Sequence, residues 1–216
     1  MRWLPDMRLV LASNNAKKLT ELGALFAPLG LTLVAQSTLG IGEADEPHAT
    51  FLENALAKAR HAAERANGAA IADDSGLCVD AFGGAPGVQS AVFAPLSGAL
   101  LDDREQQRRV QDDANNRLLL ERLDGVPDRR AHYVSTLVAL RSVDDPEPLV
   151  ATGRWYGEIL GAPQGSGGFG YDPLMHIPAL GRTVATLSAG VKNQHSHRAI
   201  AARGMLVLMR KVWHLG

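Results

Sequence analysis

The stretch RLVLASNNAKKLTELGALF, residues 8–26, decides the fold. Its first five residues are a short apolar run, which predicts a buried strand. The polar turn SNNAKK follows at residues 13–18, and from there Leu19, Leu22, Leu25 and Phe26 recur at helical spacing. A strand, a polar turn and an amphipathic helix in this order predict a chain of the α/β class.

The next segments continue this alternation. Residues 31–36 (LTLVAQ) predict a second strand, and a helix opens at Thr50, where Thr50 and Glu53 form a capping-box pattern. Residues 69–77 (AAIADDSGL) predict a strand that ends in acids, and residues 78–90 predict a further strand followed by a Gly/Pro loop.

The second half is richer in strands. We expect a helix over 101–123 ended by Gly125, a strand over 131–143, a pair of strands with a turn over 148–159, and a final helix over 196–213. Helices that alternate with strands early and strands that cluster later predict an α/β fold with a mixed sheet, parallel first and antiparallel later. We expect one continuous domain over 1–216, with two lobes and a cleft between them.

Composition narrows the classes of function. The chain has 216 residues, 46% of them hydrophobic, and 22 Lys and Arg against 23 Asp and Glu give a net charge of -1. Such a balance lacks the basic field of a duplex binder, so no nucleic-acid partner is expected. No apolar run is long enough to span a bilayer, no signal-peptide core is present, and the lone Cys78 fits a core position in a reducing cytoplasm. Residues 1–6 are interpreted as an N-terminal extension, with Met7 as an alternative start.

The turn SNNAKK is the first candidate site. Backbone N–H groups at a helix start, together with Ser13, Asn14 and Asn15, can bind an anion, and Lys17 and Lys18 add positive charge. The alternative is a capped helix start with solvated lysines. The turn is not a Walker A loop, because the GxxxxGK[ST] pattern is absent.

The segment ADDSG, residues 72–76, is the second candidate. Adjacent carboxylates suit a hard divalent cation, and because neighbours in a strand point to opposite faces, we expect only one of Asp73 and Asp74 to face the site. The alternative is a polar turn that caps a strand. Glu43, Asp45 and Glu46 could complete the metal site or be solvated loop carboxylates. Asn54 and Lys58, on the helix after this loop, could point into a cleft.

Two further segments carry polar groups. The run GSGGFGYDPLM, residues 165–175, offers a stacking face at Phe169 and an acceptor at Asp172, or it is a tight turn with a core aromatic. The run VKNQHSHRAI, residues 191–200, gathers the donors Lys192, His195, His197 and Arg198, which suit a carbonyl or a phosphate, or it is a basic helix entry on the surface. Together the four segments predict a site for a nucleobase with its phosphates nearby.

Five segments in order then resemble one known family. LASNNAKKLTEL, TFLENALAKA, ADDSGLCVDAFGGAPGVQSA, GGFGYDPL and KNQHSHR resemble the signature segments of the inosine triphosphate pyrophosphatase family, which acts on non-standard purine nucleotides. The resemblance runs from about Leu9 to Arg198. It implies an elongated mixed sheet flanked by helices and a cleft between two lobes.

The resemblance also implies an activity. Inosine, deoxyinosine and xanthosine triphosphates would be hydrolysed to the monophosphate and pyrophosphate, with Mg²⁺ as cofactor, by a cytoplasmic homodimer that contacts no membrane. It implies these roles: the triphosphate on Ser13, Asn14, Asn15, Ala16, Lys17 and Lys18; the metal on Glu46 and Asp74, with Asp74 as the catalytic base; further substrate contacts from Lys58 and Ser75; and the base on Phe169, Gly170, Tyr171, Asp172, Lys192, His197 and Arg198.

The sequence departs from the family pattern at a few positions. Lys17 stands where a glycine is common, Val92 and Pro95 in SAVFAP replace an arginine and a glycine, and TLSAGV before Lys192 lacks acids. Two alternatives stay open at this point. One is a Maf-type nucleotide pyrophosphatase, which would lack the GGFGYDP and SHR pair, and the other is a nucleotide- or RNA-binding module without hydrolysis, which adjacent acids disfavour.

Overall fold

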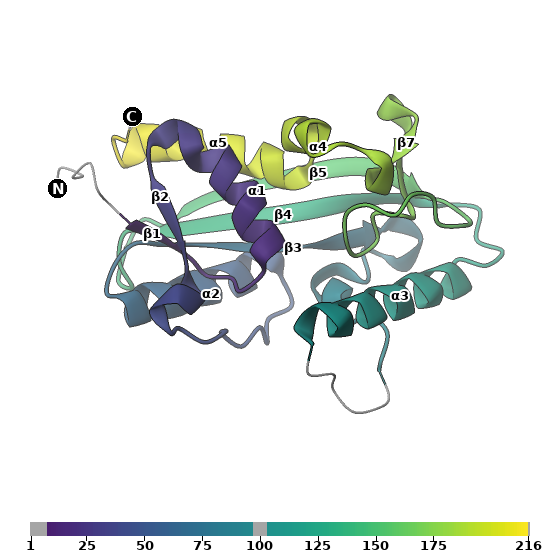
Figure 1. Ribbon diagram of the computed structural model, residues 1–216, viewed down its shortest axis with the longest axis horizontal. Coiled ribbons are helices and arrows are strands. Elements are labelled where there is room, and N and C mark those ends of the chain that lie inside the picture. The colour runs from purple at the N-terminus through teal and green to yellow at the C-terminus, as the bar shows by residue number, and fades with distance from the viewer. Residues whose placement is uncertain (1–7, 97–102, 216) are drawn as a thin grey trace. The chain divides into compact units, whose positions relative to one another are not determined.

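The structure is a computed structural model that describes residues 8–96 and 103–215 (Figure 1). The proposed extension at residues 1–6 and Met7 lie outside the described residues. Seven strands form one sheet in the order β2-β1-β3-β4-β5-β6-β7. The chain divides into two compact units: unit 1 comprises Met1–Ser75, Val134–Arg154 and Asn193–Gly216, and unit 2 comprises Gly76–Tyr133 and Trp155–Lys192. Two units agree with the expected lobes, and a cleft between them stays a prediction.

The strands and helices of unit 1 follow the predicted alternation. β1 (Arg8–Leu11) pairs in parallel with β2 (Thr32–Ala35) and with β3 (Ala70–Val79). The helices are α1 (Ala16–Phe26), α2 (Phe51–Ala66) and α5 (His197–Val212). Thr50 caps α2 as predicted, because its hydroxyl accepts a hydrogen bond from the Glu53 N–H at 3.2 Å.

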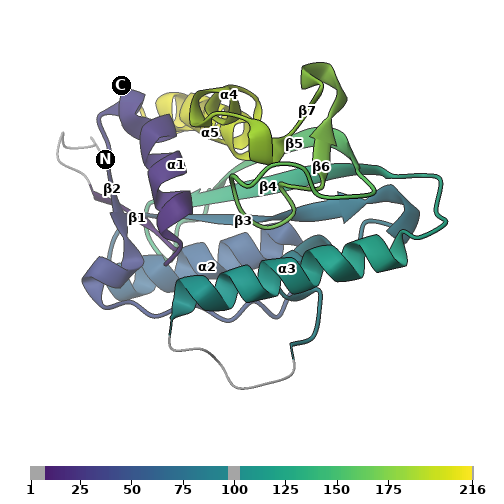
Figure 2. The same cartoon turned by 45° about the vertical axis from the view of Figure 1, so that its right-hand side comes forward.

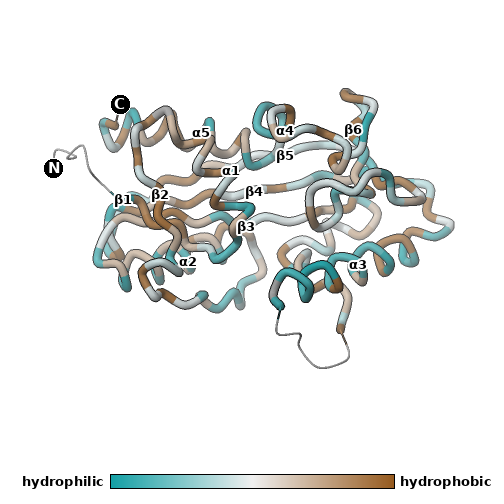
Figure 3. Tube along the Cα trace, in the orientation of Figure 1, coloured by the Kyte–Doolittle hydropathy of each residue, from teal (hydrophilic) through white to brown (hydrophobic). Residues whose placement is uncertain are grey.

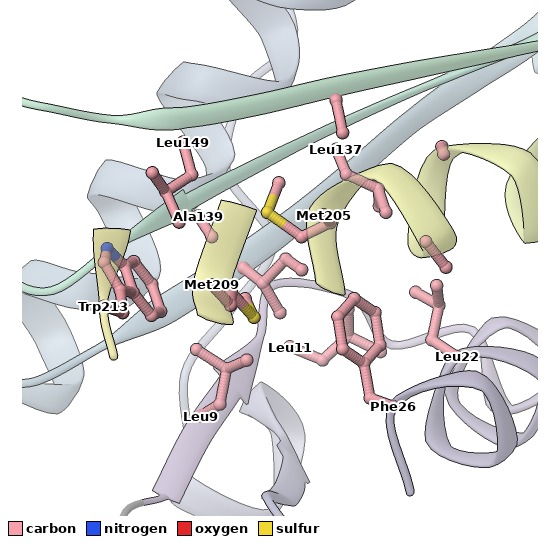
Figure 4. Close-up of a cluster of buried hydrophobic side chains, with 14 of the residues drawn as sticks. Leu9, Leu11, Leu22, Phe26, Leu137, Ala139, Leu149, Met205, Met209 and Trp213 are labelled. Carbon is pink, nitrogen blue, oxygen red and sulfur yellow. The ribbon is translucent and has the colours of Figure 1, made fainter. Parts of the chain in front are cut away.

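Alternating side chains of β1 build two cores in unit 1. Leu9 and Leu11 face α1 and α5, where they pack with Phe26 and Met205 (Figure 4). Val10 and Ala12 face α2, whose contacting residues are mostly alanines and allow a close approach. Helices therefore cover both faces of β1 (Figure 2), and the hydrophobic colour of β1 in Figure 3 reflects this burial on two sides.

Unit 2 has its own core. The helix α3 (Arg104–Arg122) packs Leu119 and Leu123 against Trp155, Ile159 and other residues of this unit. The last three strands are β5 (Leu149–Ile159), β6 (Met175–Ile177) and β7 (Arg182–Thr183). β6 pairs antiparallel with both β5 and β7, which confirms the predicted change from parallel to antiparallel pairing. β4 (Arg130–Leu140) and the short helix α4 (Ala189–His195) complete the elements.

Two predicted boundaries are wrong. Residues 70–79 form the single strand β3, so Asp73 and Asp74 lie in mid-strand and not at a strand end. Residues 149–159 form the single strand β5 and not a pair. Its Gly153 is required by packing, because a Cβ there would collide with the His197 carbonyl oxygen in α5.

Candidate active site

The turn after β1 is a capped helix start. The Asn15 side-chain oxygen accepts hydrogen bonds from the Lys17 and Lys18 N–H groups at 3.0 and 3.3 Å, and the Ser13 hydroxyl accepts one from the Asn15 N–H at 3.2 Å. The side-chain oxygen of Asn14 is buried and has no hydrogen-bond partner among the described residues. The turn therefore forms both the predicted cap and a preorganised helix N-terminus, with Ala16 and Lys17 exposed.

Lys18 is not a solvated lysine. Its Nζ atom lies 2.8 Å from Oδ2 of Asp73, in the middle of β3. Burial lowers the pKa of Lys18, and the neighbouring Asp73 carboxylate opposes only part of that effect. The lysine is thus held in place before any anion binds.

Asp73 is the centre of a buried ionic cluster. The residue is 1% exposed, and its carboxylate accepts hydrogen bonds from the Ser135 hydroxyl at 2.6 Å and from the Arg198 guanidinium at 3.2 and 3.3 Å. Burial alone would raise the pKa of Asp73, but Lys18 and Arg198 hold it well below its usual value. Asp73 is therefore a permanent carboxylate that braces the strand.

Arg198 belongs to this cluster. It is the second residue of α5 and is 3% exposed, and its donors also contact the Glu21 carboxylate on α1 and, at 3.1 Å, the Ser75 hydroxyl. All of these partners lie in unit 1. The predicted contact of Arg198 with the base stays a prediction, and in this structure its donors are engaged by protein carboxylates.

Asp74 has a different environment from its neighbour. One carboxylate oxygen, Oδ1, lies 2.7 Å from Nζ of Lys58, whereas Oδ2 is buried without a hydrogen-bond partner among the described residues. Asp74 is only 7% exposed, so its side chain does not face solvent. Burial raises the pKa of Asp74 to about 6, Lys58 opposes the rise, and the charge of Glu46 adds to it.

Lys58 joins two carboxylates. Its Nζ atom lies 2.8 Å from Oε2 of Glu46, in the acid loop before α2, as well as 2.7 Å from Asp74. Burial disfavours the ammonium, but Asp74 and Glu46 outweigh it and raise the pKa of Lys58. Burial would likewise raise the pKa of Glu46, and the Lys58 ammonium instead lowers it. The predicted pairing of the acid loop with ADDSG is therefore present for Glu46, whereas Glu43 and Asp45 are exposed.

The donor set fits a divalent cation. Glu46 and Asp74 offer carboxylate oxygens, and one of these is the orphaned Oδ2 of Asp74. Among the described residues no group of three or more His, Cys, Asp or Glu side chains gathers into a protein-only metal cage. Mg²⁺ commonly binds through one or two carboxylates and completes its shell with water and substrate phosphates, so two carboxylates are an adequate protein contribution.

The FGYD segment belongs to unit 2 and is held by its own aspartate. The Asp172 carboxylate accepts hydrogen bonds from the Tyr133 hydroxyl at 3.1 Å, from Nζ of Lys192 at 3.0 Å and from the Phe169 N–H at 3.1 Å. This places the Lys192 ammonium 5.3 Å from the centre of the Phe169 ring. Burial, with Asp172 adding to it, raises the pKa of Tyr133 well above its usual value, so this hydroxyl stays a donor.

The other two residues of the segment are anchors. Tyr171 is 4% exposed and its hydroxyl donates to the Ser90 carbonyl at 2.9 Å. Gly170 has a φ of 62°, and its N–H and carbonyl groups are both bound by side chains of α3. The segment therefore holds the half-buried Phe169 ring on a fixed backbone, with the half-buried Lys192 ammonium beside it.

The remaining predicted residues are placed as follows. The Ser75 hydroxyl donates to Asp73 at 3.1 Å in unit 1, and His197 is the half-buried first residue of α5, which Ser196 caps. Val92 and Pro95, the departures in SAVFAP, are exposed. The roles of these residues toward a substrate stay predictions.

The sequence reading missed several residues that complete these clusters. Glu21 and Ser135 contact the Asp73 cluster, Tyr133 contacts Asp172, and Asp112 and Asn116 hold Gly170. The last two had a readable signal: in QDDANN, residues 111–116, polar side chains recur at helical spacing on one stripe of the helix. The partners of β4 had none, because a lone Tyr or Ser in an apolar strand resembles any core residue.

Comparison with known proteins decides the family. The Ham1 family model matches residues 9–208. This chain belongs to the Ham1 family. A relative from Leptothrix cholodnii, named dITP/XTP pyrophosphatase, is 67% identical over 211 residues, which cover 97% of this chain and 100% of the relative. A relative of the same name from Methylibium petroleiphilum is 68% identical over 207 residues, which cover 96% of this chain and 99% of the relative.

Solved Ham1 structures share the fold. A HAM1 protein from Coxiella burnetii superposes with a TM-score of 0.83 at 35% identity, covering 95% of this chain and 100% of that one. A Mycobacterium abscessus protein described as a nucleoside-triphosphatase / dITP/XTP pyrophosphatase superposes with a TM-score of 0.68 at 36% identity. The match covers 97% of this chain and 100% of that one. The resemblance found from the motifs is thus confirmed, and so is the mixed α/β fold with a seven-stranded sheet flanked by helices.

Proposed function

We propose that this chain hydrolyses deoxyinosine, inosine and xanthosine triphosphates to the monophosphate and pyrophosphate, with Mg²⁺ as cofactor, and so removes these bases from the nucleotide pool. The relatives' names support this reaction. The single observation that carries it is Asp74, a buried carboxylate with one unpaired oxygen and a pKa of about 6. A carboxylate in that state can accept a proton near neutral pH.

The phosphates are assigned to the groups of unit 1. The helix N-terminus at Ala16, with Lys17 beside it, offers the positive end of the helix dipole and a positive charge to an anionic tail. Lys18 and Lys58 are already oriented by Asp73 and Asp74, so their ammonium groups lose little further freedom when a polyphosphate approaches. These cations offset the charge that develops on the leaving pyrophosphate.

The proton transfer is assigned to Asp74. Water attacks the α-phosphorus, the bond from that phosphorus to the oxygen bridging to the β-phosphate breaks, and the proton of the water passes to the Asp74 carboxylate. Glu46 and Asp74 would hold the metal, which when bound supplies positive charge to the phosphate oxygens. Lys58, which contacts both carboxylates, keeps them close together.

The base is assigned to unit 2. Phe169 offers a stacking face to any base. Lys192 has only donors, which suit the carbonyl oxygen at position 6 of hypoxanthine and xanthine and not the amino group of adenine. Asp172 holds the Lys192 ammonium close to the Phe169 ring, and this closeness supports a shared role of the two side chains in holding the base.

The test is pyrophosphate release. The purified protein should release pyrophosphate from inosine, deoxyinosine and xanthosine triphosphates faster than from adenosine triphosphate, and EDTA should abolish the reaction until Mg²⁺ is restored. Absence of release from all three substrates with Mg²⁺ would overturn the proposal. Release that EDTA does not affect would overturn only the metal requirement.

We also propose the homodimer and the cytoplasmic location that the resemblance implies. Among the described residues no helix combines the length and apolar character needed to cross a membrane. Sedimentation or light scattering would test the dimer, and cell fractionation would test the location.

A further inference from the structure

The inner face of α3 is polar in its middle turns. One stripe of the helix carries the polar residues Gln111, Asp112, Asn115 and Asn116. Further along the same stripe, one turn later, lies the buried Leu119, and the buried Leu123 follows at the end of the helix. A helix normally turns apolar side chains toward its core. The change from amides and an acid to leucines along one stripe needs a reason other than packing.

Half of this polar stripe fixes the segment that follows β3. The Asn115 side chain accepts a hydrogen bond from the Ala94 N–H at 2.8 Å and donates to the Ser90 and Ala91 carbonyls at 3.2 Å each. Gln111 adds a bond to the Ala94 carbonyl at 2.9 Å. The Ser90 carbonyl also receives the Tyr171 hydroxyl, so this segment is tied to the FGYD segment as well as to α3.

The other half holds Gly170 by both of its backbone groups. The Asp112 carboxylate accepts a hydrogen bond from the Gly170 N–H at 2.8 Å, and the Asn116 amide donates to the Gly170 carbonyl at 2.9 Å. The two side chains are one helical turn apart, as a clamp on a single residue requires. Figures 1 and 2 show the loop before β6 passing beside the first half of α3.

The clamp is maintained at a cost. The side-chain oxygen of Asn116 is buried and has no hydrogen-bond partner among the described residues. Such an orphaned acceptor is unfavourable, and an apolar residue would avoid it. Gly170 itself sits at a φ of 62°, which most residues avoid. Glycine adopts this φ readily, so the unfavourable feature is the orphaned Asn116 oxygen, and a buried unsatisfied group that persists calls for a functional explanation.

We propose that Asp112 and Asn116 are positioning residues that set the base-binding geometry of Phe169 and Lys192. The inference rests on the proposed function, in which the FGYD segment holds the base. Phe169 directly precedes the clamped Gly170, and its N–H is bound by Asp172, the residue that also holds Lys192. Release of Gly170 should therefore loosen the backbone next to the stacking ring and weaken its link to Asp172 and Lys192, while the phosphate-binding groups of unit 1 keep their own partners.

Separate ligands for the two parts of the nucleotide test this role. Inosine, which has no phosphate, and inorganic tripolyphosphate, which has no base, are used as inhibitors of inosine triphosphate hydrolysis. Asp112→Ala should weaken inhibition by inosine about tenfold, as expected for one lost hydrogen bond to a positioned group, and should change inhibition by tripolyphosphate less than twofold. KM for inosine triphosphate should rise more than kcat falls.

Three further variants sharpen the experiment. Asp112→Asn keeps an oxygen that can accept the Gly170 N–H and should recover most of the lost affinity for inosine. Asp113→Ala removes an exposed carboxylate from the next position of the same helix and should behave as the wild type. If Asp112→Ala does not fold, Asn116→Ala removes the other arm of the clamp and should show the same selective loss.

Three results would overturn the inference: Asp112→Ala and Asn116→Ala matching Asp113→Ala, equal losses for inosine and tripolyphosphate, or failure of Asp112→Asn to recover affinity for inosine while its thermal unfolding is normal. A wild-type protein that releases no pyrophosphate would instead refute the proposed function.

Discussion

The two faces of β3 treat adjacent carboxylates in opposite ways. Toward α1 and α5, Asp73 is compensated by Lys18, Arg198 and Ser135, and its pKa is held well below the usual value. Toward α2, Asp74 has Lys58 at one oxygen and nothing among the described residues at the other, and its pKa rises to about 6. The same side chain is thus fully compensated on one face and only partly compensated on the other. Because both carboxylates are buried, the difference teaches that compensation, and not burial, separates their pKa values.

The first prediction breaks the compensated face. Asp73→Asn leaves the Lys18 and Arg198 charges buried without their shared carboxylate, which should lower the free energy of unfolding by about 3–5 kcal/mol. Urea unfolding at pH 7 measures this change. Asp74→Asn is the matched control, one residue away in the same strand, and should lose much less. Similar losses for the two variants would show that both carboxylates are structural.

The second prediction breaks the poised face. Asp74→Asn removes the proposed proton acceptor and should lower kcat about 100- to 10,000-fold, the range for loss of a general base. The variant should fold normally, because an amide of the same shape replaces a carboxylate that is only partly compensated. Pyrophosphate release and circular dichroism check the two halves of the statement. Turnover within tenfold of wild type would exclude Asp74 as the base.

The third prediction uses pH to separate the faces. The folded-state pKa of Asp74 is about 6, above the usual aspartate value of 3.8, so its protonated form stabilises the fold at low pH and that contribution is lost as pH rises through 6. Relative to Asp74→Asn, which does not titrate, the wild type should lose about 2–3 kcal/mol of unfolding free energy between pH 4 and pH 7.

The readout is urea unfolding of the protein without metal or substrate. Asp73 shifts the other way: its contribution is present above the unfolded-state pKa and is lost only as pH falls below that value. If the difference in unfolding free energy between the wild type and Asp74→Asn does not change between pH 4 and 7, the raised pKa of Asp74 is refuted.

The alternation along β3 explains how much the sequence alone could predict. Period-two alternation correctly places Asp73 and Asp74 on opposite faces, and the apolar pattern of residues 8–26 predicts β1 and α1. The predicted end of the strand at the acids is wrong because their partners are distant in sequence: Lys58 is 16 residues away and Arg198 is 125 residues away from the carboxylate it binds. Local propensity cannot contain that compensation.

The site was predictable as a set of segments and not as a set of contacts. The motifs identify the turn at residues 13–18, the acids and the FGYD segment, yet the partners that fix them come from β4 and α3. Ser135 and Tyr133 carry no sequence signal, and Asp112 carries only the polar stripe of its helix. The turn predicted within residues 148–159 is wrong for the same reason. Gly153 is required by its close approach to α5, whereas the sequence shows only a residue type that favours turns. Long-range contacts are the information that periodicity lacks.

The last prediction extends the comparison from the two carboxylates of unit 1 to the FGYD segment of unit 2. Phe169→Ala removes a stacking face that any base can use, so kcat/KM should fall for inosine and adenosine triphosphates alike. The fall should correspond to a loss of roughly 1–3 kcal/mol of stacking free energy. Lys192→Met removes a donor that only a carbonyl-bearing base can satisfy, so the preference for inosine triphosphate should narrow about tenfold. Lys211→Met, at an exposed position near the end of α5, is the charge-matched control.

The quantity to compare is the ratio of kcat/KM for the two substrates in each variant. Tyr133 and the Phe169 N–H still hold Asp172 when Lys192 is replaced, so the backbone of the loop should keep its place and the change should fall on the choice of base. A ratio that collapses in Phe169→Ala and survives in Lys192→Met would reverse this division of labour, because the ring would then be selecting the base and the ammonium merely supporting the loop.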